Sequence, residues 1–318
     1  KSPQRVESPQ RVESPQRVES PQRTTPLVLA LRNLSKSYGA VEALDDLELR
    51  VHEGQVYGFL GRNGAGKSTA LRIVMGITHA SRGEVELFGE NVQRDDPRLR
   101  QRVGYVAQEQ HFYGWMDAAY IGQFVSGFYP TWDDTEYRRL LRQLDVPTDR
   151  KLRTFSGGMH AKLALALALA HRPPLLLLDE PTAGMDVVAR REFIDIVHDQ
   201  ATRSNRTTVF SSHLIDEVEA AADTVGIVDN GRMLYEGSLH RLRQTVKRLV
   251  GAPAETVLPA GIDDARIVVL RDRYDEGRRE LIVRAADPNM LSALGGPNWR
   301  IEQPSLEDIF VAMVTRPL

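Results

Sequence analysis

The segment Gly61–Ser68 constrains the fold of this chain more than any other. Its sequence, Gly-Arg-Asn-Gly-Ala-Gly-Lys-Ser, has the spacing G-x-x-x-x-G-K-[ST], and it stands between an expected strand, Gln55–Leu60, and an expected helix, Ser68–Met75. Glycines at these positions let the backbone curl so that its N–H groups face phosphate oxygens, and the helix N-terminus adds the positive end of its dipole. An accidental glycine-rich turn is the alternative, but four fixed positions in this context argue against it. The segment predicts a nucleotide phosphate loop in which Lys67 reaches the β- and γ-phosphates and the Ser68 hydroxyl binds Mg²⁺.

Two acidic residues follow an apolar run later in the chain. Leu175–Leu178 is continuously apolar, as expected for a central parallel strand that is covered on both faces. Asp179 and Glu180 come next, so they should lie at the carboxyl edge of the sheet, where α/β folds bind ligands. Such a pair is often merely solvated. Combined with Lys67 it predicts phosphoryl transfer, with Asp179 holding Mg²⁺ and Glu180 polarising the attacking water.

A second glycine-containing segment, Ser156–Gly158, precedes an apolar stretch that we expect to be a buried helix, Leu163–Ala170. It offers a hydroxyl, open backbone N–H groups and a helix dipole, which together could bind a second phosphate group. The alternative is a flexible loop whose serine caps the helix, and the segment alone favours that alternative. Its place in the same chain as the two earlier motifs favours the phosphate-binding role.

The remaining pattern predicts an α/β core followed by a smaller domain. Strands alternate with helices up to about residue 245, and a hairpin with a closing helix then indicates a small α+β unit. The expected strands are Leu27–Leu31, Leu47–Val51, Gln55–Leu60, Glu84–Phe88, Val103–Ala107, Leu175–Leu178, Thr207–Ser211, Thr224–Val228, Arg266–Arg271 and Arg279–Arg284. The expected helices are Ser68–Met75, Glu136–Leu144, Leu163–Ala170 and Leu306–Val314.

The ends of the chain differ from its middle. Residues 2–23 repeat the unit Ser-Pro-Gln-Arg-Val-Glu, and one valine per six residues cannot bury enough surface to offset the entropy of ordering. We expect residues 1–23 to form a disordered, expendable leader. We expect a nucleotide-binding domain at 24–245, with a helical subdomain at about 109–172, and an accessory domain at 246–318.

Composition excludes several classes of protein. The 41 basic and 43 acidic residues give a net charge of −2, which leaves no electrostatic footprint for nucleic acid. No run of 18 apolar residues is present, so nothing in the sequence is expected to span a bilayer. The absence of cysteine excludes disulfides and cysteine-ligated metals.

The motifs resemble those of the ATP-binding-cassette (ABC) ATPases over roughly residues 27–240, in the order of that family. Phe155 and Met159 flank the signature segment where leucine and glutamine are more usual, and Val187 follows the D-loop where proline is more usual. The matches are Tyr38 (adenine stacking), Gly61–Thr69 (Walker A), Gln108 (Q-loop), Ser156–Gly158 (signature), Leu175–Glu180 (Walker B), Ala183–Asp186 (D-loop) and His213 (switch histidine).

The resemblance implies a P-loop fold with a mixed sheet and a role for each matched residue. It implies catalysis by Glu180, His213, Gln108 and Lys67, and Mg²⁺ binding by Ser68, Gln108 and Asp179. It implies that ATP contacts Tyr38, Gly61, Arg62, Asn63, Gly64, Ala65, Gly66, Lys67, Ser68, Thr69, Ser156, Gly157, Gly158 and Asp186.

Partners also follow from the resemblance. In this family the signature segment of one subunit completes the nucleotide site of another, so two chains are needed, and a homodimer is the simplest closed arrangement. A transporter role requires a separate membrane permease, with this chain peripheral on the cytoplasmic face of the membrane. The aromatic-rich stretch Phe112–Tyr137 is where such cassettes dock the permease; we expect most of its rings to be buried and a few to be exposed.

The segment Pro304–Phe310 resembles the tail of cassettes that serve ABC-2-type exporters, including antibiotic-efflux systems, and the Ser-Gly-Gly-Met variant and the segment Phe128–Asp133 agree with that group. The sequence therefore favours export. The alternative is a soluble ABC ATPase that acts on DNA or ribosomes without a permease. Against it stand the single cassette, the absence of a long coiled coil between Lys67 and Asp179, and the lack of net positive charge.

Overall fold

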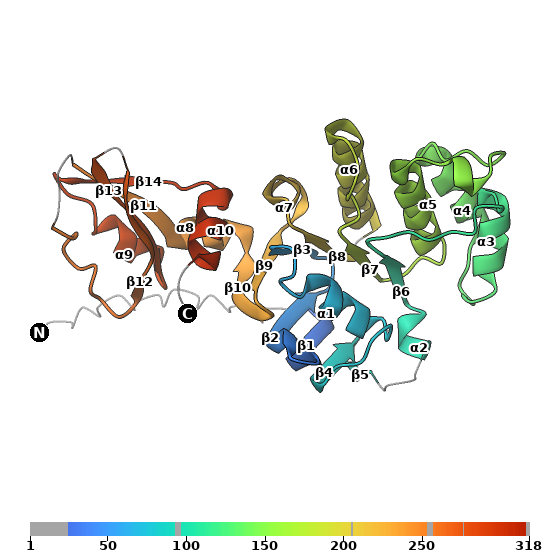
Figure 1. Cartoon of the computed structure of the whole chain (residues 1–318), viewed down its shortest axis with the longest axis horizontal. Coiled ribbons are helices and arrows are strands. Elements are labelled where there is room, and N and C mark those ends of the chain that lie inside the picture. Colours follow the sequence, from blue (N-terminus) through green and yellow to red (C-terminus); the bar gives the residue numbers. More distant parts are fainter. Residues whose placement is uncertain (1–24, 93–96, 205, 253–256, 276, 316–318) are drawn as a thin grey trace, which may run out of the picture.

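The computed structural model describes residues 25–92, 97–204, 206–252, 257–275, 277–315, and the expected leader at 1–23 lies outside these residues. Figure 1 shows three parts along the longest axis of the molecule. A sheet-rich middle part lies between a group of helices at one end and a small sheet with its own helices at the other.

The middle part contains a six-stranded mixed sheet. Five neighbouring strands run parallel, and β10 pairs antiparallel at one edge. The expected mixed sheet is therefore confirmed. In sheet order the strands are β10 (Arg232–Ser238), β9 (Thr224–Asp229), β3 (Val56–Gly61), β8 (Thr207–Ser212), β7 (Leu175–Asp179) and β6 (Val103–Val106).

Strand β7 shows why its sequence is apolar throughout. Leu175 and Leu177 belong to one hydrophobic cluster, whereas Leu176 and Leu178 belong to another on the opposite face of the sheet. All four are fully buried, because side chains alternate across a strand and both faces of this sheet are covered.

A second, antiparallel sheet packs over one of these faces together with helix α1 (Lys67–Val74). Its side chains and those of α1 enclose Tyr57 and Phe59 of β3, both of which are fully buried. In sheet order its strands are β2 (Val41–His52), β1 (Leu27–Tyr38), β4 (Arg82–Leu87) and β5 (Glu90–Asn91).

Helices cover the other face. α6 (Val187–Ser204) and α7 (Ile215–Ala221) pack there, and so does α5 (Gly157–Leu169), which contributes eight buried residues. The helical end of the molecule adds α3 (Ala118–Ser126), α4 (Asp134–Gln143) and a 3₁₀ turn, Leu152–Thr154; a one-turn helix, α2 (Pro97–Arg100), precedes β6.

The C-terminal part has its own sheet and hydrophobic cluster. Helix α10 (Leu306–Val314) joins it to the rest, because Ile309 and Phe310 share a cluster with Val218 of α7. The antiparallel strands in sheet order are β12 (Ile267–Asp275), β13 (Arg278–Ala285), β11 (Val246–Gly251) and β14 (Trp299–Glu302). Helix α8 (Leu239–Thr245) leads into β11, and α9 (Pro288–Ser292) follows β13.

The expectation that most aromatic rings of Phe112–Tyr137 are buried is wrong. Only Tyr137 is fully buried, three rings are half-buried, and five are exposed. The exposed rings lie on and around α3, whose other face buries Ala118 and Ile121. A short helix has one core-facing side, so the rings on its opposite side remain in contact with solvent. The exposed rings are Tyr113, Trp115, Tyr120, Phe124 and Phe128.

Candidate functional site

The glycine-rich loop joins the carboxyl end of β3 to the amino end of α1. Gly66 caps the helix with a left-handed backbone, φ +102°. A β-carbon there would approach the Ala43 carbonyl oxygen to 2.5 Å, so only glycine fits between the loop and β2. The loop therefore makes a tight turn at Gly66, immediately before α1.

Glu180 is the centre of the site. Its carboxylate lies 3.1 Å from the Lys67 ammonium and 3.2 Å from Nδ1 of His213. Nε2 of Gln108 donates to it at 3.3 Å. The four predicted catalytic residues come from the ends of four different elements, and the structure brings them into one group.

Lys67 is 3% exposed and its ammonium also donates to the loop carbonyls of Gly61 (2.9 Å) and Arg62 (3.1 Å). The cation is thus held at the mouth of the loop by its own backbone. This arrangement places a positive charge at the glycine-rich loop, where it could neutralise a phosphate oxygen.

Asp179 lies behind Glu180 and is fully buried. One carboxylate oxygen, Oδ1, accepts hydrogen bonds from Ser68 (2.8 Å) and Ser211 (2.9 Å), whereas Oδ2 has no hydrogen-bond partner among the described residues. Burial raises the pKa of Asp179 above its ordinary value, against the opposite effect of the two serine hydroxyls. A buried carboxylate oxygen without a partner, next to a serine hydroxyl, is a donor set that fits Mg²⁺.

A cavity of about 330 Å³ lies in front of this group. Tyr38, 51% exposed, stands at its edge with the ammonium of Lys36 4.7 Å from the ring centre. Among the predicted site residues, those that line the cavity are Tyr38, Asn63, Gly64, Ala65, Gly66, Lys67, Ser68, Thr69, Gln108 and Glu180.

Eight predicted site residues do not line this cavity. Four of them are hydrogen-bonded to residues that do line it, namely Gly61, Arg62, Asp179 and His213. The other four lie apart from it. Ser156 and Gly157 are exposed at the start of α5, where the Ser156 hydroxyl accepts from the Met159 N–H, and Gly158 follows them. Asp186 caps α6 by accepting from the N–H groups of Val188 and Ala189. Within one chain Ser156 and Asp186 cap helices, and none of the four residues lines the cavity.

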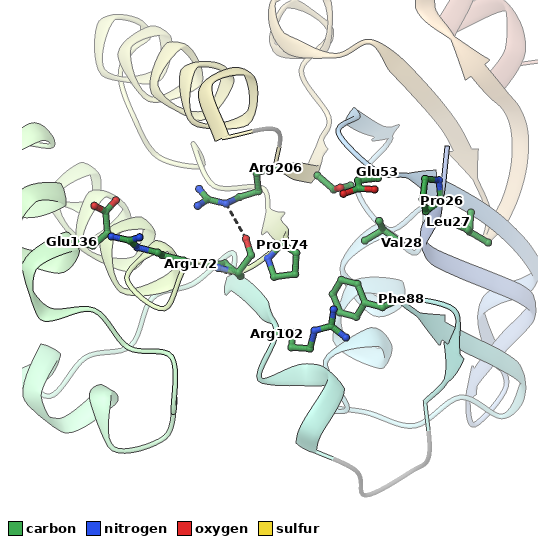
Figure 2. A pocket seen from close by; sticks show the side chains of 12 residues that line it. Pro26, Leu27, Val28, Glu53, Phe88, Arg102, Glu136, Arg172, Pro174 and Arg206 are labelled. Atoms are coloured by element: carbon green, nitrogen blue, oxygen red, sulfur yellow. Dashed lines mark hydrogen bonds between the residues drawn. The ribbon is translucent and has the colours of Figure 1, made fainter. Parts of the chain in front are cut away.

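A larger cavity, about 820 Å³, lies at the opposite edge of the central sheet. Figure 2 shows Arg206 there, donating from Nε to the Pro173 carbonyl, with Arg102 against the ring of Phe88. Pro174 and Thr207 lie at the amino ends of β7 and β8, which is the edge away from the motifs. Cavity size alone would therefore misplace the nucleotide, because α/β sheets bind ligands at the carboxyl edge.

Known proteins resemble this chain in sequence and in fold. The ABC transporter family matches residues 44–183. The bacitracin transport ATP-binding protein BcrA of Bacillus licheniformis is 34% identical over 68% of this chain and 72% of its own length. The chain belongs to the ABC transporter family of ATP-binding proteins. As a cassette of this family it binds ATP and hydrolyses it, so the enzyme class expected from the motifs is confirmed.

A further relative is similar to this chain over most of its length. The Nod factor export ATP-binding protein I of Cupriavidus pinatubonensis is 31% identical over 92% of each chain. A solved structure described as the ATP binding subunit of an ABC transporter superposes with a TM-score of 0.61 at 26% identity, over 68% of this chain and 92% of that one. The predicted cassette fold is confirmed.

Two features of the site are not predicted by the sequence patterns. The Ser211 hydroxyl, on β8, accepts from the Glu180 N–H at 2.9 Å and donates to Asp179, so one serine orients both acidic residues. Glu180 itself has a left-handed backbone, φ +43°. The sequence feature that could have predicted the role of Ser211 is its position at the carboxyl end of a buried strand.

No helix among the described residues is long and apolar enough to cross a membrane.

Proposed function

We propose that this cassette couples Mg²⁺-dependent ATP hydrolysis to export through a separate membrane permease. The observation that carries the proposal is the convergence of Lys67, Gln108 and His213 on Glu180 at the edge of a nucleotide-sized cavity.

Glu180 is the general base in this proposal. It would polarise the water that attacks the γ-phosphate, with Gln108 and His213 orienting that water and the phosphate. Lys67 would neutralise charge on the β- and γ-phosphates. Ser68 and Asp179 would hold Mg²⁺, which supplies charge neutralisation when bound.

A second cassette would complete the site. Ser156–Gly158 presents exposed donors that have no phosphate to bind within its own chain, whereas Gly61–Ser68 forms one side of a cradle. Two copies placed face to face would bring each signature segment onto the triphosphate held by the partner. A homodimer gives two equivalent sites with a single type of contact.

The exposed aromatic rings on and around α3 support a membrane partner. Tyr120, Phe124 and Phe128 are each about half exposed or more, and Phe124 packs edge-on against Phe128 with ring centres 5.4 Å apart. Exposed apolar groups gathered in one place mark interaction sites. We propose that they receive a helix of the permease, on the cytoplasmic side of the membrane.

Export is supported by the relatives' printed roles, which include bacitracin transport, Nod factor export and daunorubicin/doxorubicin resistance. The reading as a soluble ATPase acting on DNA or ribosomes has no such support, and the net charge of −2 gives no footprint for nucleic acid. We also propose the division into a cassette at 24–245, with its helical subdomain at about 109–172, and an accessory domain at 246–318, since the C-terminal sheet has its own hydrophobic cluster.

Affinity purification from membranes of the native host tests the proposal. The wild-type chain should bring down one integral membrane protein, and the complex should hydrolyse ATP only when Mg²⁺ is present. A variant with Tyr120, Phe124 and Phe128 changed to serine should lose the membrane protein and keep nucleotide binding. Recovery of ribosomal or DNA-bound material instead of a membrane protein would refute the permease assignment.

A further inference from the structure

Glu217, on helix α7, is a buried carboxylate for which the motifs give no role. It is 4% exposed and lies among polar groups of two different turns. One turn follows Glu180 and the other contains His213. We propose that Glu217 is a positioning residue that holds both turns, and thereby the base and the switch histidine, in register for hydrolysis.

The first turn is held at both of its ends. The Thr182 hydroxyl, two residues after Glu180, donates to Oε1 of Glu217 at 2.5 Å. Arg190 of α6 lies 3.6 Å from the same oxygen and donates to the Met185 carbonyl at 3.3 Å. Between these anchors the chain turns through Gly184, whose backbone is left-handed, φ +76°. Glu217 therefore fixes the D-loop relative to α7.

The second turn is held through a serine. The Ser212 hydroxyl donates to Oε2 of Glu217 at 2.6 Å and accepts from the Leu214 N–H at 2.9 Å. This pair of hydrogen bonds closes the backbone around His213, which lies between the two residues. The direction of the His213 ring toward Glu180, 3.2 Å away, thus depends on Ser212 and on the carboxylate behind it.

The chemistry of a carboxylate suits this double role. An ionised carboxylate accepts at both oxygens, so it can take one hydroxyl from each turn at the same time. An amide of the same shape has one acceptor oxygen, and its NH₂ group can only donate. Thr182, Ser212 and Glu217 are all nearly inaccessible to solvent, so water cannot replace a lost contact without a local rearrangement.

The inference rests on the catalytic role proposed for Glu180, and Glu217→Gln tests it in the full chain, assayed with its membrane partner if the wild-type chain alone is inactive. We expect kcat to fall about 10- to 100-fold, since small displacements of catalytic groups have effects of this size. The Kd for ATP should stay within about twofold, because Glu217 does not line the nucleotide cavity. Glu219→Gln is the matched control: it lies on the same helix, pairs with Arg243 at the surface, and should leave both constants unchanged.

Two further measurements separate positioning from a merely structural role. Glu217→Asp keeps two acceptor oxygens and should retain more of kcat than Glu217→Gln does, whereas a merely structural role would make the shorter side chain the more damaging change. A Thr182→Val/Ser212→Ala double variant should reproduce the loss of kcat, and adding Glu217→Gln to it should cost little more.

An unchanged kcat in Glu217→Gln at an unchanged Tm would overturn the inference, and so would a loss that is fully explained by a lower Tm. Glu180→Gln is measured beside it. If Glu180→Gln remains active, the proposed function itself fails; if only Glu217→Gln remains active, the failure is confined to the role of Glu217.

Discussion

The two glycine-containing segments of the cassette differ in how far the chain itself provides their contacts. Gly61–Ser68 is folded against its own strand and helix, and its Lys67 is buried beside Glu180. Ser156–Gly158 lies at the surface, where its serine caps a helix. The first segment forms one wall of a cavity, and the second does not line that cavity. The difference supports a site shared between two molecules. Variants of Lys67 and Glu180 test the first segment's side of that site, and a variant of Gly158 tests the second segment.

Lys67→Ala should have the largest effect. Removing the ammonium takes away the cation of the loop and leaves Glu180, 9% exposed, without its positive partner. We expect the Kd for ATP to rise at least about 100-fold, as for other charge pairs truncated on one side, and hydrolysis to disappear. Isothermal titration calorimetry measures the affinity. Lys162→Ala, which removes an ion pair with Glu192 on the helical side, is the control and should bind normally; retained affinity in Lys67→Ala would refute the cradle.

Glu180→Gln should separate binding from chemistry. The amide keeps the shape of the side chain but cannot act as a base, so we expect kcat to fall about 100- to 1,000-fold and the Kd for ATP to stay within about twofold. ATP should then hold two copies together, which size-exclusion chromatography would detect. Glu236→Gln, at a carboxylate on β10 that accepts from the Tyr57 hydroxyl, is the control outside the site. Normal turnover in Glu180→Gln would contradict its role.

These two variants concern the part of the site that the sequence predicts well. Lys67, Ser68 and Asp179 belong to short motifs in which the neighbouring residues fix the backbone, so spacing along the chain is enough to place them. The catalytic group also includes Gln108 and His213. These two residues were predicted from the resemblance to the family, because each follows an expected strand as the family's motif does. Parallel strands bring their carboxyl ends to one edge, and this is why a linear pattern predicts a compact site.

Other features depend on contacts between distant segments and could not be predicted in this way. Glu217 looks like any acidic residue on a short helix until its two hydroxyl partners, 35 and 5 residues away, are brought beside it. Helix α6 is a different case, because it is absent from the expected helices although the sequence carries its pattern. Its residues Phe193, Ile194, Val197 and Ala201 are buried at helical spacing, and this apolar periodicity is visible in the sequence.

Gly158→Asp tests the exposed segment directly. A β-carbon built on Gly158 meets no described atom within 4 Å, so the fold should accept the change. The new carboxylate would face the triphosphate of a partner molecule and repel it. We expect the Kd of the separate chain for ATP to stay within about twofold, while ATP-dependent dimerisation is lost and kcat falls about tenfold or more. Gly296→Asp, at a similarly open position in the C-terminal part, should change neither. Full hydrolysis in Gly158→Asp would argue against a shared site.

A last variant should leave nucleotide binding unchanged and alter only the pH dependence of stability, through a buried histidine on the helical side. His171 follows α5, is 2% exposed and stacks on Tyr129 with ring centres 4.0 Å apart. Burial lowers its pKa from 6.5 to about 4. Between these pH values the unfolded chain binds a proton that the folded chain excludes, so the free energy of unfolding should fall as the pH is lowered from 6.5 toward 4.

That loss should amount to at most about 3 kcal/mol and should be complete below the lower pKa. His171→Phe keeps an aromatic ring against Tyr129 and cannot bind a proton, so its urea-unfolding free energy should depend less on pH over this window than that of the wild type. His111→Phe, at a side chain that is 84% exposed, is the control and should follow the wild type. If the acid sensitivity persisted unchanged in His171→Phe, a group other than His171 would be its source.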